Sequence, residues 1–161
     1  MISKSAAAEQ FSASPRSTQK CVFYWVVFSA IGVRAVEAYR GAALFTRTSS
    51  IEGPFVKAFS DGVMPFEGAA VKAVFEELKQ QVSPHLIFTH NRKDAHQDHR
   101  LVAELNWNAF RDHLIVEYEI PKYAGDLGRP NLLVPFESEI CESNVSYIME
   151  AFHPSTAKSG S

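Results

Sequence analysis

The chain has 161 residues, of which 46% are hydrophobic, and this length and composition suit one ordinary domain with a buried core. Its formal net charge is -2, its pI is about 6.3 and its basic residues are scattered along the sequence. The sequence therefore has no basic cluster of the kind that binds nucleic acid, and we expect no nucleic-acid partner. The longest apolar run, 21–30, is about half the roughly 20 residues that a membrane span needs. We therefore expect a soluble, cytoplasmic protein with no membrane span, and Cys21 and Cys141 as free thiols.

Buried strands alternate with amphipathic helices along the chain. Residues 21–28 (CVFYWVVF) have the composition of a strand that is covered on both faces. Residues 33–45 then form a predicted helix, because small and apolar side chains recur there at spacings of three and four. The later predicted elements are a short strand 55–59, a helix 71–82, a strand 85–89, a helix from about 95 to 113, a strand 114–120, a short edge strand 132–136 and a helix 137–152. This alternation favours an α/β fold with a Rossmann-like, mostly parallel sheet and flanking helices.

Polar residues follow several of the predicted strands. They are Ser29, Asp61, the segment 90–99 and the segment 119–122. Since ligands bind at the carboxyl ends of parallel strands, we expect these four places to converge on one edge of the sheet. The segment 90–99 contains the densest group of polar side chains and opens a helix, for which Asp94, followed three residues later by Gln97, is the predicted N-cap.

The histidines of this segment allow two interpretations. His96 and His99 are three residues apart on the first turn of the predicted helix, where the positive helix end favours neutral imidazoles, as metal ligation or acid–base chemistry requires. Alternatively, they are solvated residues at an exposed helix start. A zinc site needs three protein ligands, and Asp61 and His90 are weak candidates for the others. The HxHxDH string of metallo-β-lactamase-like hydrolases nearly fits, but Asp94 stands where its first histidine would be.

Other features carry less information. Arg34 and Glu37 lie three residues apart on one helical face, either as an ordinary surface ion pair or as groups that hold a ligand's hydroxyls. The sequence has no GxGxxG, P-loop or GxSxG string, so nothing supports dinucleotide binding, P-loop phosphate binding or a serine nucleophile.

Residues 88–123, FTHNRKDAHQDHRLVAELNWNAFRDHLIVEYEIPKY, resemble bacterial zinc N-deacetylases of the PIG-L/LmbE family. The stretch WVVFSAIGVRAVEA, the Asp61-Gly62 turn and the run VKAVFEELKQQVSPHLIFTH extend this resemblance over residues 21–152. The resemblance leaves residues 1–20 as an atypical or disordered N-terminal segment and residues 153–161 as a flexible tail. It implies a zinc-dependent hydrolase that removes an N-acetyl group from an N-acetylglucosamine-type sugar conjugate.

The family's roles transfer by position onto the HxDH string. His99 would be a Zn²⁺ ligand, and His96 would stabilise the oxyanion and protonate the departing amine, while Asp98 orients His96. Arg34 and Glu37 match the family's RxxE pattern and, with Asp61, would lie on the substrate side.

The sequence also departs from the family pattern. The family's first strand ends in HPDD, which supplies two zinc ligands and the general base, and this sequence has no such string. We therefore expect no tight, stoichiometric zinc, and exposed strand edges that favour instability or self-association as a homo-oligomer. The alternative to an enzyme is a catalytically inactive or truncated remnant that acts at most as a sugar-binding module.

Overall fold

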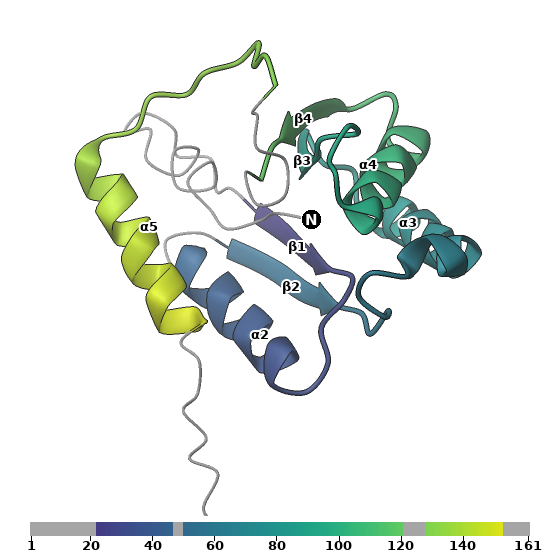
Figure 1. Cartoon of the computed structure of the whole chain (residues 1–161), viewed down its shortest axis with the longest axis horizontal. Helices are drawn as coiled ribbons and strands as arrows, with labels where there is room; N and C mark the ends of the chain where they lie inside the picture. The colour runs from purple at the N-terminus through teal and green to yellow at the C-terminus, as the bar shows by residue number, and fades with distance from the viewer. Residues whose placement is uncertain (1–21, 47–49, 121–127, 153–161) are drawn as a thin grey trace, which may run out of the picture. The chain divides into compact units, whose positions relative to one another are not determined.

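The computed structural model describes residues 22–46, 50–120 and 128–152, which divide between two compact units (Figure 1). Residues 57–133 form one of them, named here the 57–133 unit. Described residues before and after this range form the other, named here the flanking unit.

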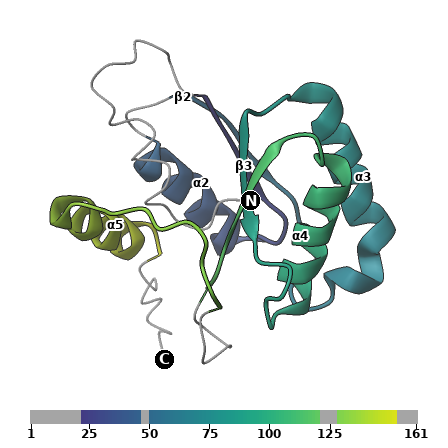
Figure 2. The same cartoon turned by 90° about the horizontal axis from the view of Figure 1, so that it is seen from above.

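The 57–133 unit is built around a strand–helix–strand motif. Strand β3 (Leu86–His90) pairs in parallel with β4 (Leu114–Tyr118), and helix α4 (Gln97–Ala109) connects them. The register runs from Leu86 opposite Leu114 to His90 opposite Tyr118, so the two strands end at the same edge. Helix α3 (Gly68–Gln81), preceded by the 3-10 turn η1 (Met64–Glu67), packs beside α4 (Figures 1 and 2).

The core of this unit follows from the periodicity of its helices. Val71, Val74, Phe75 and Leu78 form the buried face of α3, which confirms the apolar stripe predicted from the sequence. Helix α4 contributes its own buried apolar side chains, Val102, Ala103 and Ala109. A buried hydrogen bond of 2.8 Å, from the Asn106 amide to the Thr89 hydroxyl, ties α4 to β3. Helix α4 is therefore fixed against the strand whose end carries the site.

The flanking unit contains a second strand–helix–strand motif. Strand β1 (Val22–Val27) pairs in parallel with β2 (Ser50–Val56), and α2 (Val33–Phe45) connects them. The pairing shifts register between Tyr24 and Val26, opposite the Gly53-Pro54 pair. Pro54 has no N–H to donate to the ladder and Gly53 has a φ of 112°, which few other residues adopt, so this irregularity follows from the sequence.

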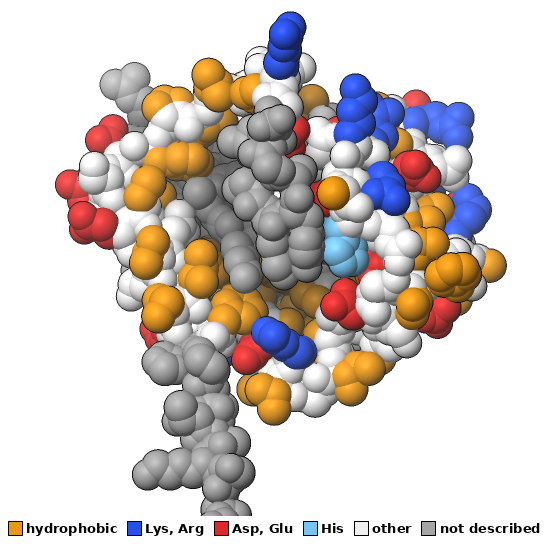
Figure 3. Space-filling view, viewed as in Figure 1, with side chains coloured by type: hydrophobic (Ala, Val, Ile, Leu, Met, Phe, Trp, Pro, Cys, Tyr) orange, Lys and Arg blue, Asp and Glu red, His pale blue; other side chains and the backbone are white. Residues whose placement is uncertain are grey.

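Helix α5 (Ser138–Ala151) completes the flanking unit by packing on α2. Phe45 of α2 stacks on Trp25 of β1, with ring centroids 6.1 Å apart, and meets the edge of Tyr147 of α5 at 5.5 Å. Gly41 allows the close approach of Phe152, the C-cap of α5, because a Cβ at position 41 would lie 3.3 Å from the Phe152 ring. Val145 and Met149 stay exposed, and Figure 3 shows apolar side chains along this helix.

Several predicted elements are confirmed and others are corrected. The α/β class with parallel strands is confirmed, with the pairs β1–β2 and β3–β4 in two small sheets. The helix at 33–45 has the predicted bounds, but the strand predicted at 55–59 is the end of β2, which begins at Ser50. The strand predicted at 132–136 is wrong, because Leu132 and Leu133 are 58% and 80% exposed and form no ladder. The helix predicted at 95–113 is shorter at both ends.

Some predictions fall outside the described residues: the N-terminal segment 1–20, Cys21, residues 121–122 and the tail 153–161. Cys141 is an exposed free thiol, as predicted. Within the described ranges, no helix combines the length and the hydropathy that crossing a membrane would require.

Candidate functional site

The candidate site lies where β3 ends and α4 begins. The Asn91 N–H donates to the Tyr118 carbonyl at 3.0 Å, which extends the pairing with β4 by one residue. The Asn91 side chain then accepts a hydrogen bond of 2.7 Å from the Lys93 N–H, and its carbonyl accepts one of 3.0 Å from the Asp94 N–H. These bonds turn the chain sharply toward the helix, as Asn side chains commonly do.

Asp94 binds two neighbours with its two carboxylate oxygens. Oδ1 accepts a hydrogen bond of 2.7 Å from the His96 N–H, and Oδ2 lies 3.0 Å from His99 Nδ1. Burial alone would raise the pKa of Asp94, but the hydrogen bonds from His96 and His99 outweigh it and hold the pKa below its usual value. Asp94 is therefore an acceptor toward both neighbours.

His96, and not Asp94, is the N-cap of α4. The helix begins at Gln97, and His96 Nδ1 accepts a hydrogen bond of 3.3 Å from the Asp98 N–H, which would otherwise lack a partner in the first turn. The prediction of Asp94 as N-cap is wrong because its carboxylate stabilises the turn two residues earlier.

Asp98 anchors the loop that contains Asp61. Its carboxylate is 1% exposed and accepts hydrogen bonds from the Gly62 N–H at 2.6 Å and the Met64 N–H at 3.1 Å. The Gln97 amide donates to the Gly62 carbonyl from the same helical turn. Gly62 has a φ of 80°, a conformation that favours glycine. Asp61 thereby lies near the start of α4, although β2, the strand that precedes it, belongs to a different sheet from β3.

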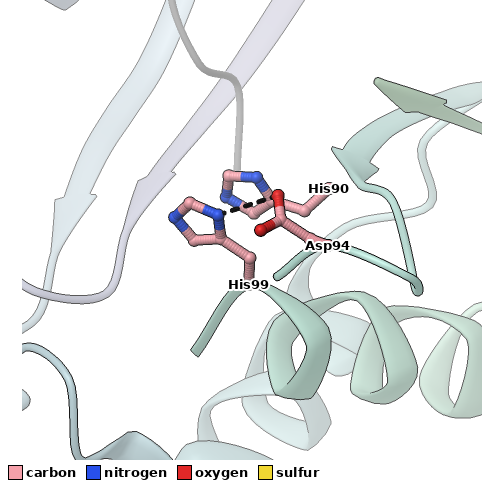
Figure 4. Close-up of side chains that lie close together, drawn as sticks. All are labelled: His90, Asp94 and His99. Atoms are coloured by element: carbon pink, nitrogen blue, oxygen red, sulfur yellow. Dashed lines mark hydrogen bonds and ion pairs between the residues drawn. The ribbon is translucent and has the colours of Figure 1, made fainter. Parts of the chain in front are cut away.

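Three imidazoles stack at this place (Figure 4 shows two of them). The rings of His90 and His99 are parallel within 1°, with centroids 3.8 Å apart, and His96 stacks on His99 at 4.5 Å. His90 is 2% exposed, and its Nδ1 has no hydrogen-bond partner among the described residues. Its burial, together with repulsion from His99, lowers the pKa of His90 to about 3, so this ring is neutral at pH 7.

Two groups of side chains have the donor atoms of a metal site. His90, Asp94 and His99 place one ligand atom each within 4.8 Å of one another, and so do Asp61, His96 and Asp98. Imidazole and carboxylate are the ligands that zinc takes in catalytic sites. The structure thus brings His96, Asp98 and His99 together with the two weaker candidates, Asp61 and His90. It also gives Asp94 a place in the cluster, beside His99, in addition to its role in the turn.

The predicted substrate pair, Arg34 and Glu37, lies on α2 in the flanking unit. The Arg34 guanidinium is 3.1 Å from the Glu37 carboxylate, and the Arg34 side chain is 75% exposed. The Glu37 side chain is only 13% exposed, so the pair joins an exposed guanidinium to a largely buried carboxylate, and both interpretations that the spacing allowed stay open. Ser29, also predicted at the site, belongs to the flanking unit as well.

Comparison of the chain with family models, curated proteins and solved structures finds no match.

Proposed function

We propose that this chain is a metal-dependent amide hydrolase of the PIG-L/LmbE kind, with N-acetylated amino-sugar conjugates as its substrate class. The observation that supports the proposal most directly is the state of His96. Its Nδ1 accepts a backbone N–H, so a neutral His96 carries its proton on Nε2. That N–H is the donor that an oxyanion formed during amide cleavage requires.

The position of the site supports the same proposal. His96 and His99 stand side by side at the first turn of α4, directly after the carboxyl end of β3, where α/β folds of the Rossmann type bind their ligands. A Zn²⁺ ion, when bound, would supply Lewis acidity that makes water a nucleophile near neutral pH. His99 is the residue that would hold it, and its imidazole fits zinc in donor type.

The two tasks proposed for His96 make different demands on its ring. Donating a hydrogen bond from Nε2 to an oxyanion agrees with the observed cap. Protonating the departing amine first requires a proton on Nδ1, which breaks the 3.3 Å bond from the Asp98 N–H. The geometry therefore favours the oxyanion role, and Asp98 orients His96 through its backbone N–H.

A second candidate function follows from the missing HPDD string, which in the family supplies two ligands and the base. A chain that provides only His99 of the family's three ligands binds zinc weakly and would serve as a non-catalytic module for the same sugar conjugates.

Zinc titration and release of free amine from an N-acetylglucosamine conjugate test both candidates. For the hydrolase, we expect His99→Ala to lose zinc binding, and His96→Ala to keep zinc but lose turnover. His113→Ala is the matched control, because His113 lies after α4 and outside both metal groups. Unchanged turnover in either site variant would defeat the assigned roles. Saturable sugar binding without zinc or turnover in the unmodified chain would favour the module.

A further inference from the structure

Asp94 and His99 form a carboxylate–imidazole pair that the family resemblance does not assign. An ionised carboxylate only accepts hydrogen bonds, so the 3.0 Å contact from Asp94 Oδ2 requires a proton on His99 Nδ1. A neutral His99 then has its lone pair on Nε2. In metal sites, a ligating histidine commonly donates its other ring N–H to a carboxylate, which fixes the ring and raises its basicity.

The alternative, in which His90, Asp94 and His99 all bind one ion, conflicts with the stacking. An imidazole directs its lone pair within the plane of its ring, and the His90 and His99 rings are parallel within 1° and stacked at 3.8 Å. Two separate parallel planes cannot both contain the same ion. His90 therefore packs against the face of the His99 ring, and Asp94 contacts the edge of the His99 ring at Nδ1 (Figure 4).

We propose that Asp94 is a positioning residue that keeps His99 in the tautomer whose Nε2 lone pair is available to a divalent cation. The identity of that ion rests on the proposed function, but the tautomer does not. His96 and His99 then have opposite tautomers on one helical turn: His96 presents an Nε2–H donor, and His99 presents an Nε2 lone pair.

The second oxygen of Asp94 makes the proposal sharply testable. Oδ1 accepts the His96 N–H at 2.7 Å, and only an oxygen can take that place. In Asp94→Asn, the amide oxygen must therefore face His96, and the amide NH₂ must face His99 Nδ1. The NH₂ donates, so His99 must accept on Nδ1 and carry its proton on Nε2. This variant inverts the tautomer while it preserves the turn.

The experiment is long-range ¹H–¹⁵N correlation of the histidine rings in the full chain, free of metal, at about pH 8, where ordinary imidazoles are neutral. We expect Nδ1–H for His99 in the unmodified chain, Nε2–H in Asp94→Asn and a mixture in Asp94→Ala. Asp112→Asn, an exposed acid beyond α4, is the matched control and should change nothing. Backbone spectra check that each variant is folded.

Zinc titration of the same samples separates positioning from ligation. We expect Asp94→Asn to weaken zinc binding by about 10- to 100-fold, and more than Asp94→Ala does, because the inverted tautomer blocks Nε2. If Asp94 were itself a zinc ligand, Asp94→Ala would bind zinc more weakly than Asp94→Asn does. A proton on His99 Nε2 in the unmodified chain, or an unchanged tautomer in Asp94→Asn, overturns the proposal. Failure of the unmodified chain to bind zinc would instead count against the proposed function.

Discussion

Replacing Asp98 with alanine should destabilise the 57–133 unit substantially. The carboxylate is 1% exposed and accepts two backbone N–H groups, from Gly62 at 2.6 Å and from Met64 at 3.1 Å. Hydrogen bonds to a charged group contribute about 1.5–3 kcal/mol each, which gives roughly 3–6 kcal/mol for the pair. The Gly62 backbone is half-exposed and regains a bond to water, whereas Met64 is buried. We therefore expect a loss near the lower limit, about 3 kcal/mol.

Urea unfolding followed by Trp107 fluorescence, in a Trp25→Phe background, measures this loss within the unit that contains Asp98. Asp98→Asn should lose about half as much, because its amide oxygen can still accept one of the two N–H groups. Glu104→Ala, an exposed change on the same helix, is the control and should stay within about 0.5 kcal/mol. A loss below about 1 kcal/mol in Asp98→Ala would show that the carboxylate does not anchor the loop.

Two further predictions concern the same unit. Glu117 accepts hydrogen bonds of 2.7 Å from the Arg92 guanidinium and from the Trp107 indole, and Arg92 is half-exposed. Glu117→Ala should therefore lower the free energy of unfolding, measured in urea, by about 1–2 kcal/mol. A change close to zero would show that the Arg92–Glu117 pair is only a surface contact. The pKa of His90 is about 3 in the folded chain against 6.5 for an ordinary histidine, so between these values only the unfolded chain binds the proton. In EDTA, the His90 contribution to the free energy of unfolding should be complete above about pH 6.5 and should fall by up to roughly 5 kcal/mol as the pH is lowered to about 3. Unfolding curves measured across this acid range should lose that contribution in His90→Gln.

The sequence predicted the elements whose signal is local. Helix α3 shows its buried face in the spacing of Val71, Val74, Phe75 and Leu78, and the structure confirms it because nothing distant changes that face. The start of α4 was mispredicted for the opposite reason. Asp94 and His96 are both able to cap a helix, and the choice depends on which backbone N–H each side chain reaches after the turn at Asn91.

The site was predicted in part. The HxDH spacing places His96 and His99 on one helical turn, and the structure confirms this. The stacking of His90 on His99 depends on the approach of β3 to α4, which residue spacing does not specify. The contact of Asp94 with His99 could have been predicted locally, because the two residues are only five positions apart at a helix start. The capping pattern instead led to the prediction of Asp94 as the N-cap.

Backbone hydrogen bonding explains much of this cluster without any function. Asp94 holds the turn before α4, His96 caps the helix and Asp98 holds the loop at Gly62, each by accepting a backbone N–H. It does not explain His90, which is 2% exposed with an Nδ1 that has no partner among the described residues. Burying an unpaired polar nitrogen costs about 1–3 kcal/mol, and an apolar ring could make the same stack without that cost. His113 Nδ1 and Asn144 Oδ1 are also buried without a partner among the described residues, so an unpaired atom alone does not mark a site. What distinguishes His90 is its stack on His99, the residue proposed to hold the metal, and a functional site would accept such a cost there.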